Sequence, residues 1–88
     1  MAEIYDIQIR VVSQTGQCRA GHKVGDQWTV FDKTPSDMCL AAFNTLYPNL
    51  RALRFGGSFP WEADPNASSV ACPDNENPVV FELKRLKI

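Results

Sequence analysis

Apolar and polar residues alternate near the start of the chain. Between Ile4 and Val12 the apolar set occupies every second position, at Tyr5, Ile7, Ile9 and Val11. Alternation with a period of two is typical of a strand with one buried face. Three later runs also have the composition of short strands and are bounded by turn residues: Gln27–Phe31, Ser68–Cys72 and Val79–Leu83. The pattern therefore predicts four strands.

A helix is predicted between the second and third of these strands. Thr34 suits the N-cap position, and Pro35 suits the first helical position. Residues of high helix propensity follow from Met38 to Tyr47. Pro48 is expected to end or break the helix, because its ring removes a backbone donor. A further turn or two is expected up to Phe55, closed by a Gly-Gly pair.

The fold class follows from the order and faces of these segments. Apolar residues recur at helical spacing and are expected to face the sheet: Cys39, Phe43, Leu46, Leu50 and Leu53. Arg51 and Arg54 fall on the opposite, solvated side. The order β-β-α-β-β predicts an α+β fold, with one mainly antiparallel sheet packed against one main helix. Without repeats or linkers, we expect a single domain over residues 1–88.

Composition narrows the classes of partner. The chain has 88 residues, with nine Lys and Arg against ten Asp and Glu. Domains that bind nucleic acid usually carry a clear positive excess, so nucleic acid is not expected as a partner. The sequence shows neither a signal-peptide pattern nor an apolar stretch near the roughly 18 residues of a membrane span, so we expect a cytoplasmic protein without a membrane partner. A chain this short has a thin core, which favours a homo-oligomer.

Three cysteines and one histidine are the main candidates for chemistry. Cys18 and His22 lie in a polar connection, Cys39 lies near the predicted helix start, and Cys72 ends a predicted strand. Three thiols and one imidazole are the full ligand set of a Cys3His zinc site, and thiolates also hold iron–sulfur clusters. The paired C-x2-C pattern of most zinc sites is absent. The leading prediction is a small metal- or cluster-binding module, with a structural or redox role.

Two other interpretations stay open. In the first, Cys18 is the nucleophile and His22 the general base of a small thiol enzyme or redox protein. Cys39 is a further reactive candidate, since the partial positive charge at a helix N-terminus stabilises a thiolate. A small-molecule pocket would then be edged by Phe55, Phe59 and Trp61. In the second interpretation the thiols are inert apolar side chains, and the protein is an interaction subunit that binds a protein partner.

Four segments together carry a family pattern. They are Cys18–Asp26 (CRAGHKVGD), Met38–Pro48 (MCLAAFNTLYP), Leu53–Glu62 (LRFGGSFPWE) and Val70–Asp74 (VACPD), the last followed by Asn77–Phe81 (NPVVF). The chain thereby resembles a family of small, uncharacterised bacterial and archaeal proteins. The resemblance implies that all three cysteines and His22 belong to the family pattern, and it implies no activity. Leu40 departs from that pattern, which has proline there, so we expect the helix to begin earlier and Cys39 to lie less close to its N-terminus.

Overall fold

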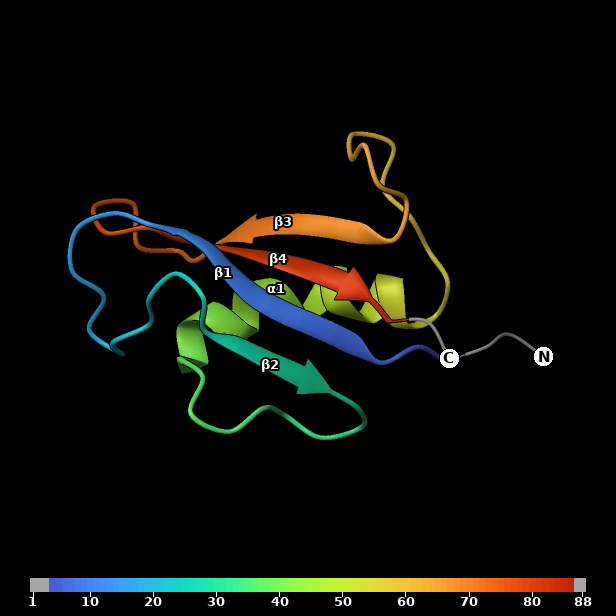
Figure 1. Ribbon diagram of the computed structural model, residues 1–88, viewed down its shortest axis with the longest axis horizontal. Helices are drawn as coiled ribbons and strands as arrows, with labels where there is room; N and C mark the ends of the chain where they lie inside the picture. The colour runs from blue at the N-terminus through green and yellow to red at the C-terminus, as the bar shows by residue number, and fades with distance from the viewer. Residues whose placement is uncertain (1–3, 87–88) are drawn as a thin grey trace.

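The computed structural model describes residues 4–86, which form four strands and one helix. In chain order they are β1 (Ile7–Gln14), β2 (Gln27–Val30), α1 (Leu40–Arg54), β3 (Ala67–Ala71) and β4 (Val79–Arg85). The strands form one antiparallel sheet in the order β2-β1-β4-β3, and α1 covers one of its faces (Figure 1). The predicted α+β fold and the β-β-α-β-β order are therefore confirmed. Over residues 4–86, no helix has the length and apolar character needed to cross a membrane.

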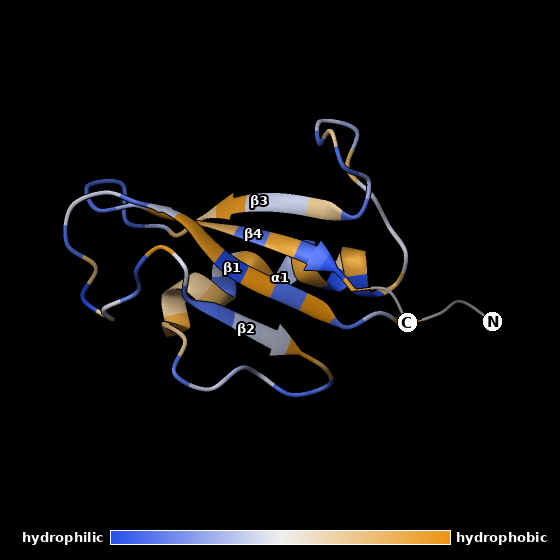
Figure 2. Cartoon of the chain, in the orientation of Figure 1, coloured by the Kyte–Doolittle hydropathy of each residue, from blue (hydrophilic) through white to orange (hydrophobic). Residues whose placement is uncertain are grey.

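The two central strands supply most of the sheet side of the core. Apolar and polar residues alternate along β1 and β4, as Figure 2 shows. The buried apolar residues of the two strands are Ile7, Ile9, Val11, Val79, Phe81 and Leu83. Ile9 lies opposite Leu83, and Val11 lies opposite Phe81, so the two apolar rows pack side by side. The face predicted for the first strand, with Ile7, Ile9 and Val11 on one side, is thus correct.

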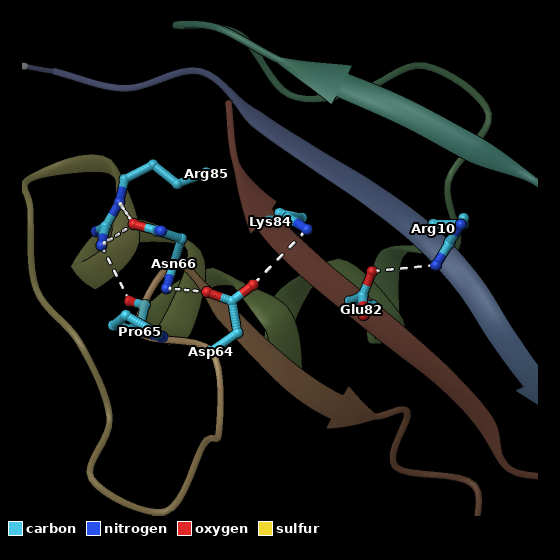
Figure 3. Close-up of polar contacts among 7 residues, drawn as sticks. All are labelled: Arg10, Asp64, Pro65, Asn66, Glu82, Lys84 and Arg85. Atoms are coloured by element: carbon cyan, nitrogen blue, oxygen red, sulfur yellow. Dashed lines mark hydrogen bonds and ion pairs between the residues drawn. The ribbon is translucent and has the colours of Figure 1, made fainter. Parts of the chain in front are cut away.

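The outer face of the sheet is polar. Arg10 of β1 lies directly opposite Glu82 of β4, and their side chains form an ion pair of 3.2 Å (Figure 3). Lys84 forms a second ion pair with Asp64, of 3.6 Å, at the same face. These charged pairs keep this side of the sheet hydrated.

The helix begins later than the sequence predicts. Cys39 is its N-cap residue and Leu40 its first residue, so the predicted N-cap at Thr34 is wrong. Asp37 adopts a left-handed conformation with φ of 63°, which a helix does not accommodate. The indole N–H of Trp28 also donates to the carbonyl of Ser36, at 3.0 Å, and holds this segment as a turn. The earlier start expected from Leu40 is likewise wrong, and Cys39 lies directly at the helix N-terminus.

Pro48 does not end the helix, which continues to Arg54. Proline removes one intrahelical hydrogen bond and costs about 3 kcal/mol in a helix interior. Here Pro48 is exposed, so water can hydrate the carbonyl that it leaves free. Burial of a leucine side chain stabilises by about 1.5–3 kcal/mol, and three leucines of α1 are buried: Leu46, Leu50 and Leu53. Packing therefore outweighs the proline. The helix ends at Arg54, with Phe55 as its C-cap residue, and the chain then turns at Gly56, whose φ is 88°.

Arg85 fixes the long connection between α1 and β3. Its Nη1 donates to the carbonyls of Leu53 and Gly57, at 2.9 and 2.7 Å. Its Nη2 donates to the carbonyl of Pro65, at 3.0 Å, and both Nη2 and Nε donate to Asn66 Oδ1 (Figure 3). One guanidinium thus joins the end of the helix, the connecting loop and the residues before β3.

Candidate thiol site

The structure brings the three cysteines to one small pocket of about 180 Å³. Cys18 comes from the connection after β1, Cys39 is the N-cap residue of α1, and Cys72 directly follows β3. All three are free thiols and half-buried. Residues distant in sequence thus line one site, which we name the thiol pocket.

The first turn of α1 forms one wall of the thiol pocket, through Ala41 and Ala42. The Cys39 side chain makes no capping hydrogen bond, so its sulfur is not engaged by the backbone of that turn. The N-terminus of a helix carries a partial positive charge from its unpaired N–H groups. Arg19 adds a full positive charge to the lining and Asp74 a negative one. The pocket lining thus combines three cysteines, the first turn of a helix, one cationic residue and one anionic residue.

A turn after β3 holds the opposite wall in place. Asp74 Oδ1 accepts hydrogen bonds from the backbone N–H groups of Asn77 and Glu76, at 3.1 and 3.0 Å. These bonds, chiefly the one from Asn77, lower the pKa of Asp74 from its ordinary value. Asn77 Oδ1 in turn accepts from the backbone N–H of Gln17, at 2.9 Å. The turn that follows Cys72 is thereby tied to the residue before Cys18, which keeps the two thiols at one pocket.

The thiol of Cys72 is engaged by the backbone. Its Sγ accepts a hydrogen bond from the Val79 N–H, at 3.3 Å, and its own N–H donates to the Val79 carbonyl, at 2.9 Å. Cys72 is therefore held by β4, whereas the Cys39 sulfur makes no hydrogen bond with residues 4–86.

His22 has a structural position beside the pocket. The ring is 5% exposed and lies edge-on to Trp28 and Phe81, with centroids 5.1 and 6.2 Å away. Its Nε2 accepts a hydrogen bond from the backbone N–H of Cys39, at 2.9 Å. Because an N–H group only donates, the Nε2 lone pair is the acceptor in this contact. His22 thus positions the residue that begins α1.

The predicted pair of Cys18 and His22 is not formed in this structure. No hydrogen bond within residues 4–86 joins the His22 ring to the Cys18 thiol. His22 is also not among the residues that line the thiol pocket. Its Nε2 lone pair, which a base or a ligand would need, is occupied by the Cys39 N–H.

The four predicted ligands do not form a ready metal centre. In the part of the chain that the structure describes, no group of three or more His, Cys, Asp or Glu side chains is placed to hold a metal ion. A Cys3His site would require His22 to release the Cys39 N–H and the thiols to reorient. Three thiols nevertheless share one pocket, and thiols are the preferred donors for soft metal ions.

The three aromatic residues predicted to edge a pocket make separate contacts. The rings of Phe59 and Trp61 contact each other with centroids 5.1 Å apart and an angle of 37° between their planes. Phe55 instead lies under the guanidinium groups of Arg51 and Arg54, at 5.5 and 5.9 Å. None of the three lines the thiol pocket. None lines either of two further hollows, one between β2 and α1 and one along the chain that follows β2.

Sequence reasoning missed the contributions of Asp74 and Asn77 to the thiol pocket. The Pro-Asp-x-x-Asn spacing from Pro73 is typical of a turn closed by an aspartate side chain, and it could have indicated a fixed wall next to Cys72.

Searches of protein-family models, curated proteins and solved structures find no match to this chain.

Proposed function

We propose that the protein is a small thiol-redox module in which Cys39 is the reacting thiol. The observation that carries this proposal is the grouping of three free thiols around one pocket at the N-terminus of α1. Reactive cysteines are found at helix N-termini, near cationic side chains and partly exposed. Cys39 has all three properties, with Arg19 in the same lining.

The proposed reaction is thiol–disulfide exchange with a low-molecular-weight disulfide. The Cys39 thiolate attacks one sulfur of that disulfide, a mixed disulfide forms, and one small thiolate leaves. A second cysteine of the pocket then attacks the Cys39 sulfur and displaces the other small thiolate. An internal disulfide results, and the small disulfide is reduced to two thiols by the two electrons that the protein gives up. We assign the module to the cytoplasm, where thiols are kept reduced.

The hydrogen bonds and positions of the three cysteines favour Cys39 as the reacting thiol. Cys72 Sγ accepts a backbone hydrogen bond, and Cys18 lies outside any helix. Only Cys39 lies at the start of a helix, and its backbone is held there by His22. The role of His22 in this proposal is positioning, since its Nε2 is engaged by an N–H donor.

Alkylation of the reduced protein with limiting iodoacetamide tests the proposal. Peptide mass spectrometry should show Cys39 reacting at least tenfold faster than Cys18 and Cys72. Incubation with glutathione disulfide should then yield an internal disulfide that includes Cys39 and is absent in Cys39→Ser, while single Ser variants at the other two positions identify its partner. Equal, slow alkylation of all three cysteines without disulfide formation would leave inert thiols, as in an interaction subunit, and would refute the proposal.

A bound soft metal ion is the second candidate function, favoured by the three thiols that share one pocket. Elemental analysis and an absorption spectrum of tag-free protein, purified without oxygen, distinguish it from the redox module. Near-stoichiometric metal that is lost in Cys18→Ala or Cys72→Ala would replace the redox proposal. Visible bands would indicate an iron–sulfur cluster, and a colourless metalloprotein would indicate zinc.

A further inference from the structure

A second hollow lies on the other side of the first turns of α1. The helix packs against β3, β4 and β1, whereas no Cα atom of α1 lies within 8 Å of a Cα atom of β2. The chain that leaves β2 loops outward and returns to the start of α1 (Figure 1). Between this loop, the end of β2 and α1 lies a groove of about 440 Å³, which we name the α1 groove. It is separate from the thiol pocket and does not depend on the proposed function.

The walls of the α1 groove are mostly apolar and exposed. Leu40, at the helix start, is 85% exposed, and Phe31 and Tyr47 are also exposed. Phe43 and Tyr47 lie one turn apart on α1, with ring centroids 5.9 Å apart. Exposed apolar side chains gathered around a hollow mark a binding surface more often than a solvated face. The volume falls in the range of small-molecule sites, about 300–1,000 Å³.

Charge indicates which chemical class the α1 groove would take. Its lining includes two cations, Lys33 and Arg54, against one anion, Asp32. The Arg54 side chain is 16% exposed, and its Nη2 lies 2.8 Å from Asp32 Oδ1. The Asp32 side chain is 90% exposed, so an incoming carboxylate can replace it on Arg54 while Asp32 returns to water. The groove therefore has one positive charge in excess beside an apolar wall.

We infer that the α1 groove binds a small amphipathic carboxylate with an aromatic body. The carboxylate pairs with Arg54, and the aromatic body contacts Phe31, Phe43 and Tyr47. A neutral analogue of the same shape lacks the ion pair and binds more weakly. Hydrogen bonds between a guanidinium and a carboxylate are among the stronger polar contacts in proteins.

Titration of isotope-labelled protein with 4-phenylbutyrate, followed by NMR, tests the inference. Saturable shifts are expected around Phe43, Tyr47 and Arg54, and 4-phenylbutyramide should bind at least fivefold more weakly. Leu40→Ser should weaken binding of the carboxylate at least fivefold. Val24→Ser is the matched control, because Val24 is also exposed and lies outside the groove; its affinity should equal that of the unmodified protein.

Asp32→Asn gives a test in the opposite direction. Removal of the competing carboxylate should raise the affinity for 4-phenylbutyrate at least threefold and leave the affinity for 4-phenylbutyramide unchanged. Shifts that fall outside the groove, equal binding of acid and amide, or an unchanged affinity in Leu40→Ser would each overturn the inference. So would concentration-dependent shifts of the same residues without ligand, because a second copy of the chain would then be the occupant.

Discussion

Replacement of Arg85 by methionine should remove a large part of the stability of this protein. Methionine keeps an unbranched apolar stem of similar reach but provides no donor. The carbonyls of Leu53 and Gly57, which are partly buried, then lose their partner. Asn66 and Pro65 lose three more exposed hydrogen bonds.

The expected magnitude follows from the two partly buried hydrogen bonds. A hydrogen bond to a charged group contributes about 1.5–3 kcal/mol, so the lower limit for the pair is about 3 kcal/mol. Small proteins have roughly 0.05–0.15 kcal/mol of stability per residue, which is about 4–13 kcal/mol for a chain of this size. A loss of about 3 kcal/mol corresponds to a fall in melting temperature of about 12–24 °C. Arg85→Lys should recover only part of this loss, since an ammonium lacks the planar fork.

Urea unfolding, followed by tryptophan fluorescence, measures the loss. Arg10→Met is the matched control, because the ion pair of Arg10 with Glu82 joins side chains that are 49% and 34% exposed. An exposed ion pair contributes about 0–1 kcal/mol, so the control should stay near the unmodified protein. An Arg85→Met loss under about 1 kcal/mol, or one no larger than that of Arg10→Met, would refute the assigned role of Arg85. Amide exchange over residues 56–66 should also accelerate in Arg85→Met alone.

Three further changes have defined outcomes. His22→Phe keeps an aromatic ring but leaves the Cys39 N–H unpaired, so the free energy of unfolding should fall by about 1–3 kcal/mol. His22→Gln keeps an acceptor, so its free energy of unfolding should fall by less. Equal losses for the two variants in urea unfolding would contradict the hydrogen-bond assignment. The pKa of Asp74 is lowered in the folded protein by backbone hydrogen bonds, so its contribution to stability is present above the ordinary value of 3.8 and is lost as pH falls below it. Asp74→Asn should therefore show a smaller fall in stability under acid than the unmodified protein, and parallel curves would oppose this. Gly56→Ala should lower the free energy of unfolding by about 1 kcal/mol, because φ of 88° strains any side chain, and an unchanged urea midpoint would argue against that conformation.

The strands could be predicted because their signal is local. Period-two alternation in β1 and β4 depends only on which side of the sheet each residue faces, and the sequence carries that information directly. The helix start could not be predicted in the same way. Thr34 and Pro35 have the right composition for a helix start, but the left-handed Asp37 and the bond from Trp28 to Ser36 set the boundary. These are contacts between segments, which local propensity does not encode.

The candidate site, too, could be predicted in its residue types but not in its contacts. Residue type was enough to single out the three cysteines, but their meeting depends on Asn77, which links the turn after β3 to Gln17. The partner of His22 is a backbone N–H, which has no sequence signature. Arg54 was expected on the solvated side, yet its guanidinium is largely covered and pairs with Asp32. The spacing of residues in the sequence indicates neither the hydrogen bond from Cys39 to His22 nor the ion pair between Arg54 and Asp32.

The pairing of β1 with β4 has a consequence for synthesis of the chain. Arg10 and Glu82 are neighbours in the middle of the sheet but stand 72 positions apart. The core therefore cannot close on the ribosome until β4 has emerged, and contacts of such long range also slow folding. Until then β1 and β3 lack the strand that lies between them, and their apolar rows and open edges are accessible to chaperones and proteases. Chains that stop before β4 should consequently be removed by the cell rather than accumulate in a folded form.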